Sequence, residues 1–106
     1  MTPYIQVFTT IDSEEGAQQL AKHIVAERLA GCVQVLGPIR STYWWEGEIE
    51  DAEEWLCLIK ASQERYADLE ASLKQIHPYD TPEILAMPVI RGNEDYLHWL
   101  QQQLQG

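Results

Sequence analysis

The chain has 106 residues, of which 45% are hydrophobic, and a formal net charge of −10 at pH 7. These values fit one compact globular domain over residues 1–106, and no apolar run reaches the ~20 residues that cross a bilayer. The seven basic residues are scattered along the chain, which excludes nucleic acids as partners because phosphate binding requires clustered Lys and Arg side chains.

The first predicted element is a strand over residues 4–11, YIQVFTTI, whose large side chains alternate between two faces. Asp12, followed by Glu15 three residues later, predicts a capping box at the start of a helix. That helix has an apolar stripe at helical spacing, formed by Ala17, Leu20, Ala21, Ile24 and Val25. Gly31 is expected to end the helix in a left-handed conformation.

Two long strands, 32–45 and 48–62, are predicted next, joined by a tight turn at Glu46-Gly47. The dipeptide Gly37-Pro38 predicts a bulge or bend in the first strand, because proline donates no hydrogen bond to a ladder. The acidic run EGEIEDAEE, which crosses the turn, is expected to form a solvated, solubilising face.

The chain contains two cysteines, Cys32 and Cys57. The hairpin register places Cys57 opposite residues near Gly37 rather than opposite Cys32, so we expect no disulfide. Two reduced thiols fit a reducing compartment, and the N-terminal residues have neither the basic nor the apolar region of a secretory signal. A cytoplasmic protein is therefore expected.

A second helix is predicted over residues 64–76, a strand over 82–90, and a last helix over 94–103 that Asn93 caps. The two helices are expected to bury the residues that share their apolar faces: Tyr66, Leu69, Leu73 and Ile76 in one, and Tyr96, Leu97, Trp99 and Leu100 in the other. The order β-α-β-β-α-β is that of the α+β, ferredoxin-like split βαβ fold, here with a C-terminal helix added.

Aromatic side chains are unusually frequent on the predicted strands. They are Tyr4, Phe8, Tyr43, Trp44, Trp45 and Trp55. Because helices cover only one face of such a sheet, a single chain of this size leaves much of this surface exposed. The sequence therefore predicts a homo-oligomer that buries sheet faces and extends strand edges.

The segment HPYDTPE, residues 77–83, places an imidazole, a phenol and two carboxylates between prolines. His77 stands at a helix end, where an imidazole either stabilises the helix C-terminus or ligates Cu, Zn or Ni. The spacing alone favours the first role. One histidine and two separated cysteines do not supply the four ligands of a closed zinc site, although a subunit boundary or water can complete a partial one.

For two further residues, Cys32 and Lys60, the sequence allows two roles each. Cys32, at the start of a strand, is either a small buried hydrophobe or a soft ligand for Cu(I). Lys60 either pairs with a carboxylate at the end of the sheet or lines a small polar cleft with Tyr79 and Glu83. His23 and His98 are expected at the surface.

Signatures of catalysis are missing from the sequence. It contains no Gly-rich phosphate loop, no G-x-S-x-G and no cysteine with a clear partner histidine. We therefore expect a protein that is not an enzyme and carries no organic cofactor.

Five strings in this order and spacing, ERLAGCVQV, IRSTYWWEGEIE, EEWLCLIKAS, HPYDTPEI and YLHWL, resemble the CutA family of divalent-cation tolerance proteins. The match covers essentially the whole chain. The resemblance implies a ferredoxin-like subunit in a tight homotrimer, with sheets joined between subunits, similar in architecture to PII signalling proteins. It also implies binding of divalent metals, copper among them.

The resemblance also implies site residues. It makes His77 and Cys32 candidate metal ligands. The candidates for a ligand cleft are Tyr43, Trp45, Lys60, Tyr79, Glu83, Tyr96 and Trp99. The alternative function is a PII-like sensor or adaptor trimer that binds a small molecule or a partner protein in clefts between subunits.

Overall fold

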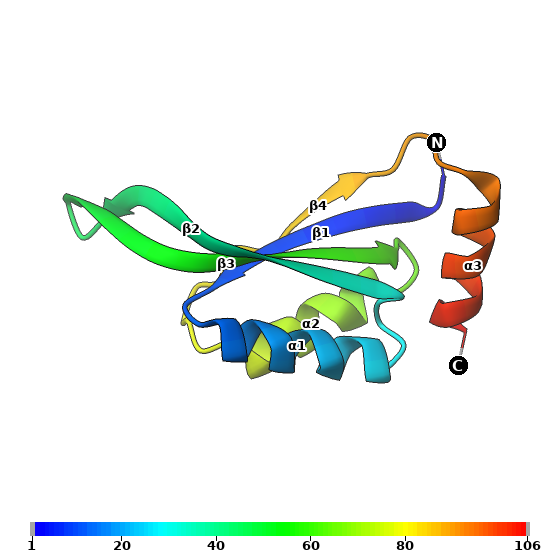
Figure 1. The fold of residues 1–106 in the computed structure, drawn as a ribbon, viewed down its shortest axis with the longest axis horizontal. Helices are drawn as coiled ribbons and strands as arrows, with labels where there is room; N and C mark the ends of the chain where they lie inside the picture. The colour runs from blue at the N-terminus through cyan, green and yellow to red at the C-terminus, as the bar shows by residue number, and fades with distance from the viewer. Residues whose placement is uncertain (1, 106) are drawn as a thin grey trace.

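The computed structural model describes residues 2–105, which form four strands and three helices in the order β-α-β-β-α-β-α (Figure 1). The elements are β1 (Tyr4–Ile11), α1 (Glu14–Ala26), β2 (Cys32–Trp45), β3 (Glu48–Ser62), α2 (Tyr66–Ile76), β4 (Leu85–Pro88) and α3 (Glu94–Leu104). The predicted α+β class and order of elements are confirmed, as are the bounds of the two long strands.

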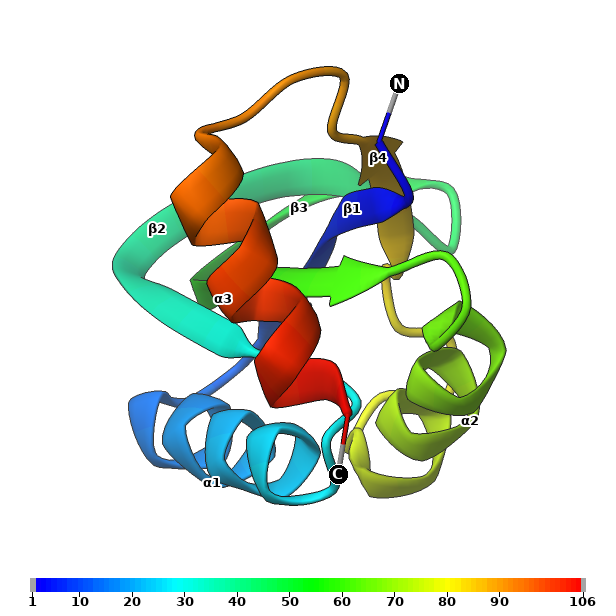
Figure 2. The ribbon, with the colours of Figure 1, turned by 90° about the vertical axis from the view of Figure 1, so that its right-hand side faces the viewer.

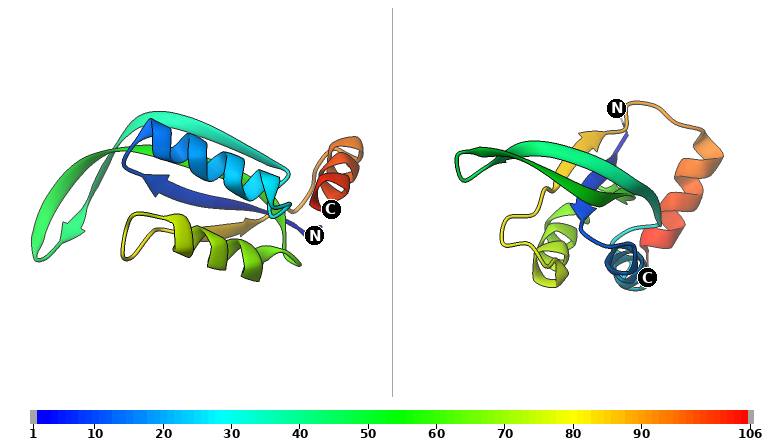
Figure 3. Two further views of the ribbon diagram at one scale, coloured as in Figure 1. Left: turned by 90° about the horizontal axis from the view of Figure 1, so that it is seen from below. Right: turned by 60° about the vertical axis from the view of Figure 1, so that its left-hand side comes forward.

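The strands form one antiparallel sheet in the order β2-β3-β1-β4. Helices α1 and α2 lie side by side beneath one face of this sheet (Figure 3, left), and α3 stands at the end where β1 begins (Figure 2). This arrangement is the split βαβ unit that the sequence predicts, with α3 added outside it.

The main core lies between the sheet and the helices α1 and α2. Alternation along β1 turns Val7 and Ile11 toward the helices, where Ile59 of β3 and Leu73 of α2 are fully buried beside them. A smaller cluster joins α3 to the sheet through Tyr4, Leu100 and Leu104. Cys57 belongs to the main core, and burial raises the pKa of its thiol to about 11.

Both ends of α1 differ from the prediction. The N-cap is Ser13 rather than Asp12, and its hydroxyl accepts the Gly16 N–H at 3.0 Å. At the other end the chain leaves the helix early, and the left-handed residue is Arg28, with a φ of 62°, rather than Gly31. Gly31 instead lies against α3, and a Cβ there would require the Leu100 side chain to move.

The shorter elements also differ. Helix α2 begins at Tyr66, two residues later than expected, and β4 covers only Leu85–Pro88 because it pairs only with residues 5–8 of β1. In α3, Tyr96 and Trp99 are exposed, whereas Leu100 and Leu104 are buried. The cause is that Leu97, Leu100 and Leu104 share the helix face that packs against Tyr4, and Tyr96 and Trp99 lie outside that face.

The β2–β3 hairpin extends well beyond the other strands (Figure 1). Strand β1 ends opposite Trp55, whereas the pairing of β2 with β3 continues to Trp45 and Glu48. The register shifts between Leu36 and Ile39, which confirms the predicted bulge at Gly37-Pro38. Gly37 lies against the Trp55 ring so closely that a Cβ would overlap it.

The sheet face opposite α1 and α2 carries a contiguous apolar patch that no described residue covers; only its end, at Tyr4, is packed against α3. We call it the open sheet face; cross-strand pairing groups on it Phe8, Leu36, Leu56, Leu58, Leu85 and Met87. Leu85 is 50% exposed in the single chain and Met87 44%. Contiguous apolar surface of this kind marks an interaction site.

Within the described residues the two cysteines are free thiols. Cys32 pairs across the strands with Lys60, and Cys57 pairs with Val35, so the predicted absence of a disulfide is confirmed for this part of the chain. No described helix has the length and apolar character required to span a membrane.

Candidate functional site

His77 ends α2 and is held by two hydrogen bonds. The side chain is only 7% exposed, and its Nε2 lies 2.8 Å from the Thr10 carbonyl oxygen. Its Nδ1 accepts the Tyr79 backbone N–H at 3.1 Å. Because Nδ1 accepts, the ring proton is on Nε2, which donates to Thr10. The imidazole therefore ties the segment after α2 to the end of β1.

This arrangement decides which task His77 performs in the single chain. A metal ligand must present a free lone pair, yet one ring nitrogen carries the proton and the other accepts a hydrogen bond. Ligation by His77 therefore requires one of these bonds to break. In the single chain His77 has a structural role, but it differs from the one that the spacing favoured: the ring bonds the Thr10 carbonyl of β1 and the Tyr79 N–H rather than the carbonyl groups at the end of α2.

Tyr79, two residues further on, reaches back to the hairpin. Its hydroxyl donates to Oε2 of Glu54 at 2.8 Å, and its ring lies edge-on to His77 at a centroid distance of 4.7 Å. Glu54 is only 6% exposed. Burial, and next the hydrogen bond to Glu54, raise the pKa of the Tyr79 phenol well above its usual range.

Replacing Tyr79 with phenylalanine is expected to lower the free energy of unfolding by about 1 kcal/mol at pH 7, because Glu54 loses a donor. The pKa of Tyr79 is raised in the folded state, so its contribution is present below pH ~10, where the unfolded phenol is neutral, and is lost as the pH rises through the folded pKa. Wild-type stability should therefore fall more steeply above pH ~10 than that of Tyr79→Phe. Urea unfolding between pH 7 and 11 measures both slopes; parallel curves would contradict the assignment.

A groove of about 850 Å³ lies between the hairpin and the segment that follows α2. We call it the acidic groove, and it is lined by Thr10, Ser41, Thr42, Tyr43, Trp45, Glu50, Glu54, Tyr79, Asp80, Thr81 and Glu83. Four of these residues are acidic and none is basic. The groove therefore presents a negative, oxygen-rich surface beside aromatic rings.

The predicted ligand-cleft residues divide into two groups. Tyr43, Trp45, Tyr79 and Glu83 line the acidic groove. Lys60, Tyr96 and Trp99 do not. Lys60 is six residues from Glu54 along β3, which is about 20 Å. Within one chain it therefore cannot line a cleft with Tyr79 and Glu83, which was one of its two predicted roles.

The second group gathers where β2 begins. The Lys60 ammonium donates to Oε1 of Gln34 at 2.9 Å, rather than to a carboxylate, and Cys32 is its cross-strand neighbour. Burial raises the pKa of Tyr96, and the adjacent Cys32 thiol raises it further. The Tyr96 and Trp99 rings lie 5.6 Å apart. This end of the molecule thus carries a thiol, an amine and two rings.

The two candidate metal ligands lie apart. Cys32 is level with Gln6 of β1, whereas His77 contacts Thr10, four residues or about 13 Å along that strand. Within residues 2–105, no three or more His, Cys, Asp or Glu side chains are grouped so that they can hold one metal ion. His77 and Cys32 thus do not form a joint site in one chain.

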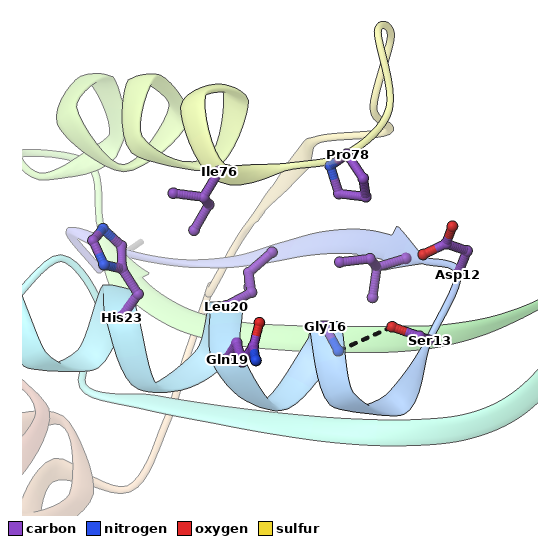
Figure 4. A pocket seen from close by; sticks show the side chains of 9 residues that line it. Asp12, Ser13, Gly16, Gln19, Leu20, His23, Ile76 and Pro78 are labelled. Carbon is purple, nitrogen blue, oxygen red and sulfur yellow. Dashed lines mark hydrogen bonds between the residues drawn. The ribbon is translucent and has the colours of Figure 1, made fainter.

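A second cavity, of about 470 Å³, lies between α1 and the end of α2 (Figure 4). Asp12 and Ser13 stand at one end of it and His23 at the other, with Ile76 and Pro78 across from them. His23 is exposed, as predicted. The lining is mixed and carries no charge cluster.

Thr10, Glu50 and Glu54 line the groove but were not predicted from the sequence. The acidic run was expected to be solvated throughout, yet Glu54 is buried and accepts a hydrogen bond from Tyr79. Strand alternation contained part of the signal, since it places Glu50 and Glu54 on the same face of β3 as each other.

Comparison with known proteins finds close relatives of the whole chain. Residues 5–103 match the family model described as CutA1 divalent ion tolerance protein. The "Divalent-cation tolerance protein CutA" of Thermus thermophilus is 42% identical over 96 residues, which are 91% of this chain and 93% of that protein. The rice "Protein CutA 1, chloroplastic" is 39% identical over 99 residues, 93% of this chain but 56% of the rice protein.

Solved structures of related proteins have the same fold as this chain. The crystal structure of CutA from Xylella fastidiosa matches with a TM-score of 0.96 at 33% identity, covering 98% of this chain and 100% of that one. The fold described above is therefore shared along essentially its full length.

Proposed function

The chain belongs to the CutA1 divalent ion tolerance family, and from this membership we propose that it is a non-enzymatic homotrimer that binds divalent cations, copper among them. The observation that carries the proposal is the family match over residues 5–103. A net charge of −10 and a groove lined by carboxylates without a basic residue support it, since such a surface concentrates cations.

The trimer is supported by surface that the single chain leaves uncovered. The open sheet face is apolar, and β2 and β4 are sheet edges in the described chain. A closed ring of three copies, with sheets joined between subunits, would remove both kinds of exposure. The hairpin, which extends past its own sheet, is the element that would reach a neighbour.

The soft and the hard metal donors lie in different parts of the molecule. His77 and Cys32 offer an imidazole and a thiol, which suit copper, but each needs further donors from another subunit or from water. The acidic groove offers carboxylate and hydroxyl oxygens, which suit harder cations. Copper and harder divalent ions are thus expected to use different parts of the surface.

Calorimetric titration of the purified protein with Cu(II) and Zn(II), with oligomeric mass recorded in the same buffer, tests the proposal. We expect a mass of three chains and saturable binding at one ion per chain or one per trimer. Loss of binding in His77→Ala, but not in His23→Ala, would assign the imidazole; retention would place the ion elsewhere. A monomeric mass, or uptake that does not saturate, would contradict the proposal.

A sensor or adaptor that binds a small molecule is the second candidate function. The observation that favours it is the size of the acidic groove, about 850 Å³, which lies in the range of ligand pockets. A ligand that binds only the folded protein raises its melting temperature. A metabolite screen without any shift would count against this candidate.

We place the protein in the cytoplasm, and the two free thiols support that placement. The rice relative is described as chloroplastic, so compartments differ among relatives. Cell fractionation with an antibody against the native protein tests the placement.

A further inference from the structure

We propose that α3 is a strap that controls access to the Cys32 thiol, and that this helix detaches locally while the rest of the fold stays closed. The inference rests on the proposed function, because it gives one of the two candidate copper ligands a regulated exposure.

The first step of the argument is that α3 covers the start of β2. Gly31 lies so close to α3 that a Cβ there would require the Leu100 side chain to move. The Tyr96 side chain lies against the thiol of Cys32 itself, and Cys32 is only partly exposed. A thiol reagent or a metal ion therefore gains full access to Cys32 only when α3 moves away.

The second step is that α3 is attached apart from the main core. The helix stands at one end of the sheet (Figure 2), and its buried residues Leu100 and Leu104 pack with Tyr4 in a small cluster distinct from the core beneath the sheet. Local opening requires only the contacts of the moving element to break. A helix held by so little apolar surface therefore opens at a lower cost in free energy than the whole fold.

The third step concerns the C-terminal end of α3, which two arginines hold. Arg28, in the turn after α1, donates to the Gln103 carbonyl oxygen at 3.1 Å, and Arg65, in the turn before α2, donates to the Leu104 carbonyl oxygen at 2.6 Å. The last carbonyl groups of a helix have no partner within the helix, and α3 has no basic residue in its own last turn. The two guanidinium groups therefore fix this end of α3 to the loops of the neighbouring helices.

The backbone of Arg28 supports this role. Its φ of 62° is the left-handed conformation that usually places a glycine after a helix. An arginine is less suited to this conformation than glycine, but its side chain reaches α3, 75 residues away in sequence. Replacing Arg28 with glycine thus removes the contact to α3 without straining the turn.

The experiment measures how fast the thiol reagent DTNB modifies the native, full-length assembled protein. Slow modification of the wild type is expected, and Cys32→Ser should abolish it, because Cys57 is fully buried. Arg28→Gly combined with Arg65→Ala should increase the rate about tenfold, since two hydrogen bonds from charged groups are lost and the detached state becomes more populated. DTNB is an anion, so the loss of positive charge by itself would slow the reaction.

The matched control is Arg40→Ala, which removes the same charge from the hairpin, where Arg40 pairs across the strands with Glu53. It should change the rate less than twofold. Arg28→Gly alone is the milder variant and should increase the rate about threefold, because one of the two hydrogen bonds remains. Circular dichroism of both Arg28 variants should match that of the wild type.

Three results would overturn the inference. An unchanged rate in the Arg28 variants is the first, because it shows that something other than α3, such as a neighbouring copy, covers the thiol. Modification of Cys57 as fast as that of Cys32 is the second, because it shows that the whole fold opens. Equal acceleration by Arg40→Ala is the third. The thiol reaction requires no metal, so the strap can fail while copper titration of the wild type succeeds, and the reverse.

Discussion

Replacing His77 with alanine is expected to lower the free energy of unfolding by about 3 kcal/mol. The change removes a side chain that is 7% exposed, leaves a cavity, and leaves the Thr10 carbonyl and the Tyr79 N–H without their partner. Loss of buried hydrogen bonds and of packing each costs about 1–3 kcal/mol. Urea unfolding monitored by tryptophan fluorescence measures the difference.

His23→Ala is the matched control, because His23 is exposed and lies on α1. Its effect should stay within about 0.5 kcal/mol. His77→Gln keeps a donor and an acceptor near the same positions and should recover part of the loss. An effect of His77→Ala no larger than that of His23→Ala would show that the two ring hydrogen bonds do not anchor the segment after α2.

Replacing Leu85 with glutamate is expected to convert the proposed trimer to single chains. Leu85 lies on the open sheet face and pairs with Phe8 across the strands. A carboxylate buried there in an interface would have to lose its water without gaining a partner, which costs several kcal/mol in each of three copies. Sedimentation at micromolar concentration measures the mass.

Because Leu85 is 50% exposed in the single chain, the substitution leaves the core between the sheet and the helices intact. Circular dichroism should therefore show the same secondary structure as the wild type. Gln18→Glu, on the exposed side of α1, adds the same charge and should remain trimeric. A trimeric mass for Leu85→Glu would exclude the open sheet face as the subunit interface.

The hydrogen bonds of His77 and Tyr79 fix the position of the segment after α2, which forms one side of the acidic groove. His77 holds the segment after α2 against β1, and Tyr79 then reaches Glu54 on the hairpin. Asp80 and Glu83 lie on the same segment. The imidazole therefore positions half of the groove's carboxylates without lining the groove itself.

Local patterns in the sequence determined the elements of this protein. Alternation along residues 4–11 and 48–62 identified the strands and the buried face, because a side chain's face depends only on its neighbours along the chain. The turn at Glu46-Gly47 and the bulge at Gly37-Pro38 were found from the backbone properties of glycine and proline, which are also local. Five short strings, read together, were specific enough to identify the family.

The exact caps and the buried faces of the short elements were not determined in this way. Asp12 and Ser13 are both good caps, and only the path of the chain from β1 selects Ser13. The exposure of Tyr96 and Trp99 depends on where α3 meets the sheet, a contact between residues far apart in sequence.

The candidate site was decided by the tertiary structure. Glu54 looked like one charge in an acidic run, yet it is only 6% exposed and accepts a hydrogen bond from Tyr79, 25 residues further along the chain. A cleft shared by Lys60 and Tyr79 was one of two alternatives that the sequence left open, yet the length of β3 separates the two residues. The sequence determines which side chains are present and which of them share one face of a helix or strand. The distance between two such faces is set by packing, which depends on the whole chain and, in the proposed trimer, on its neighbours.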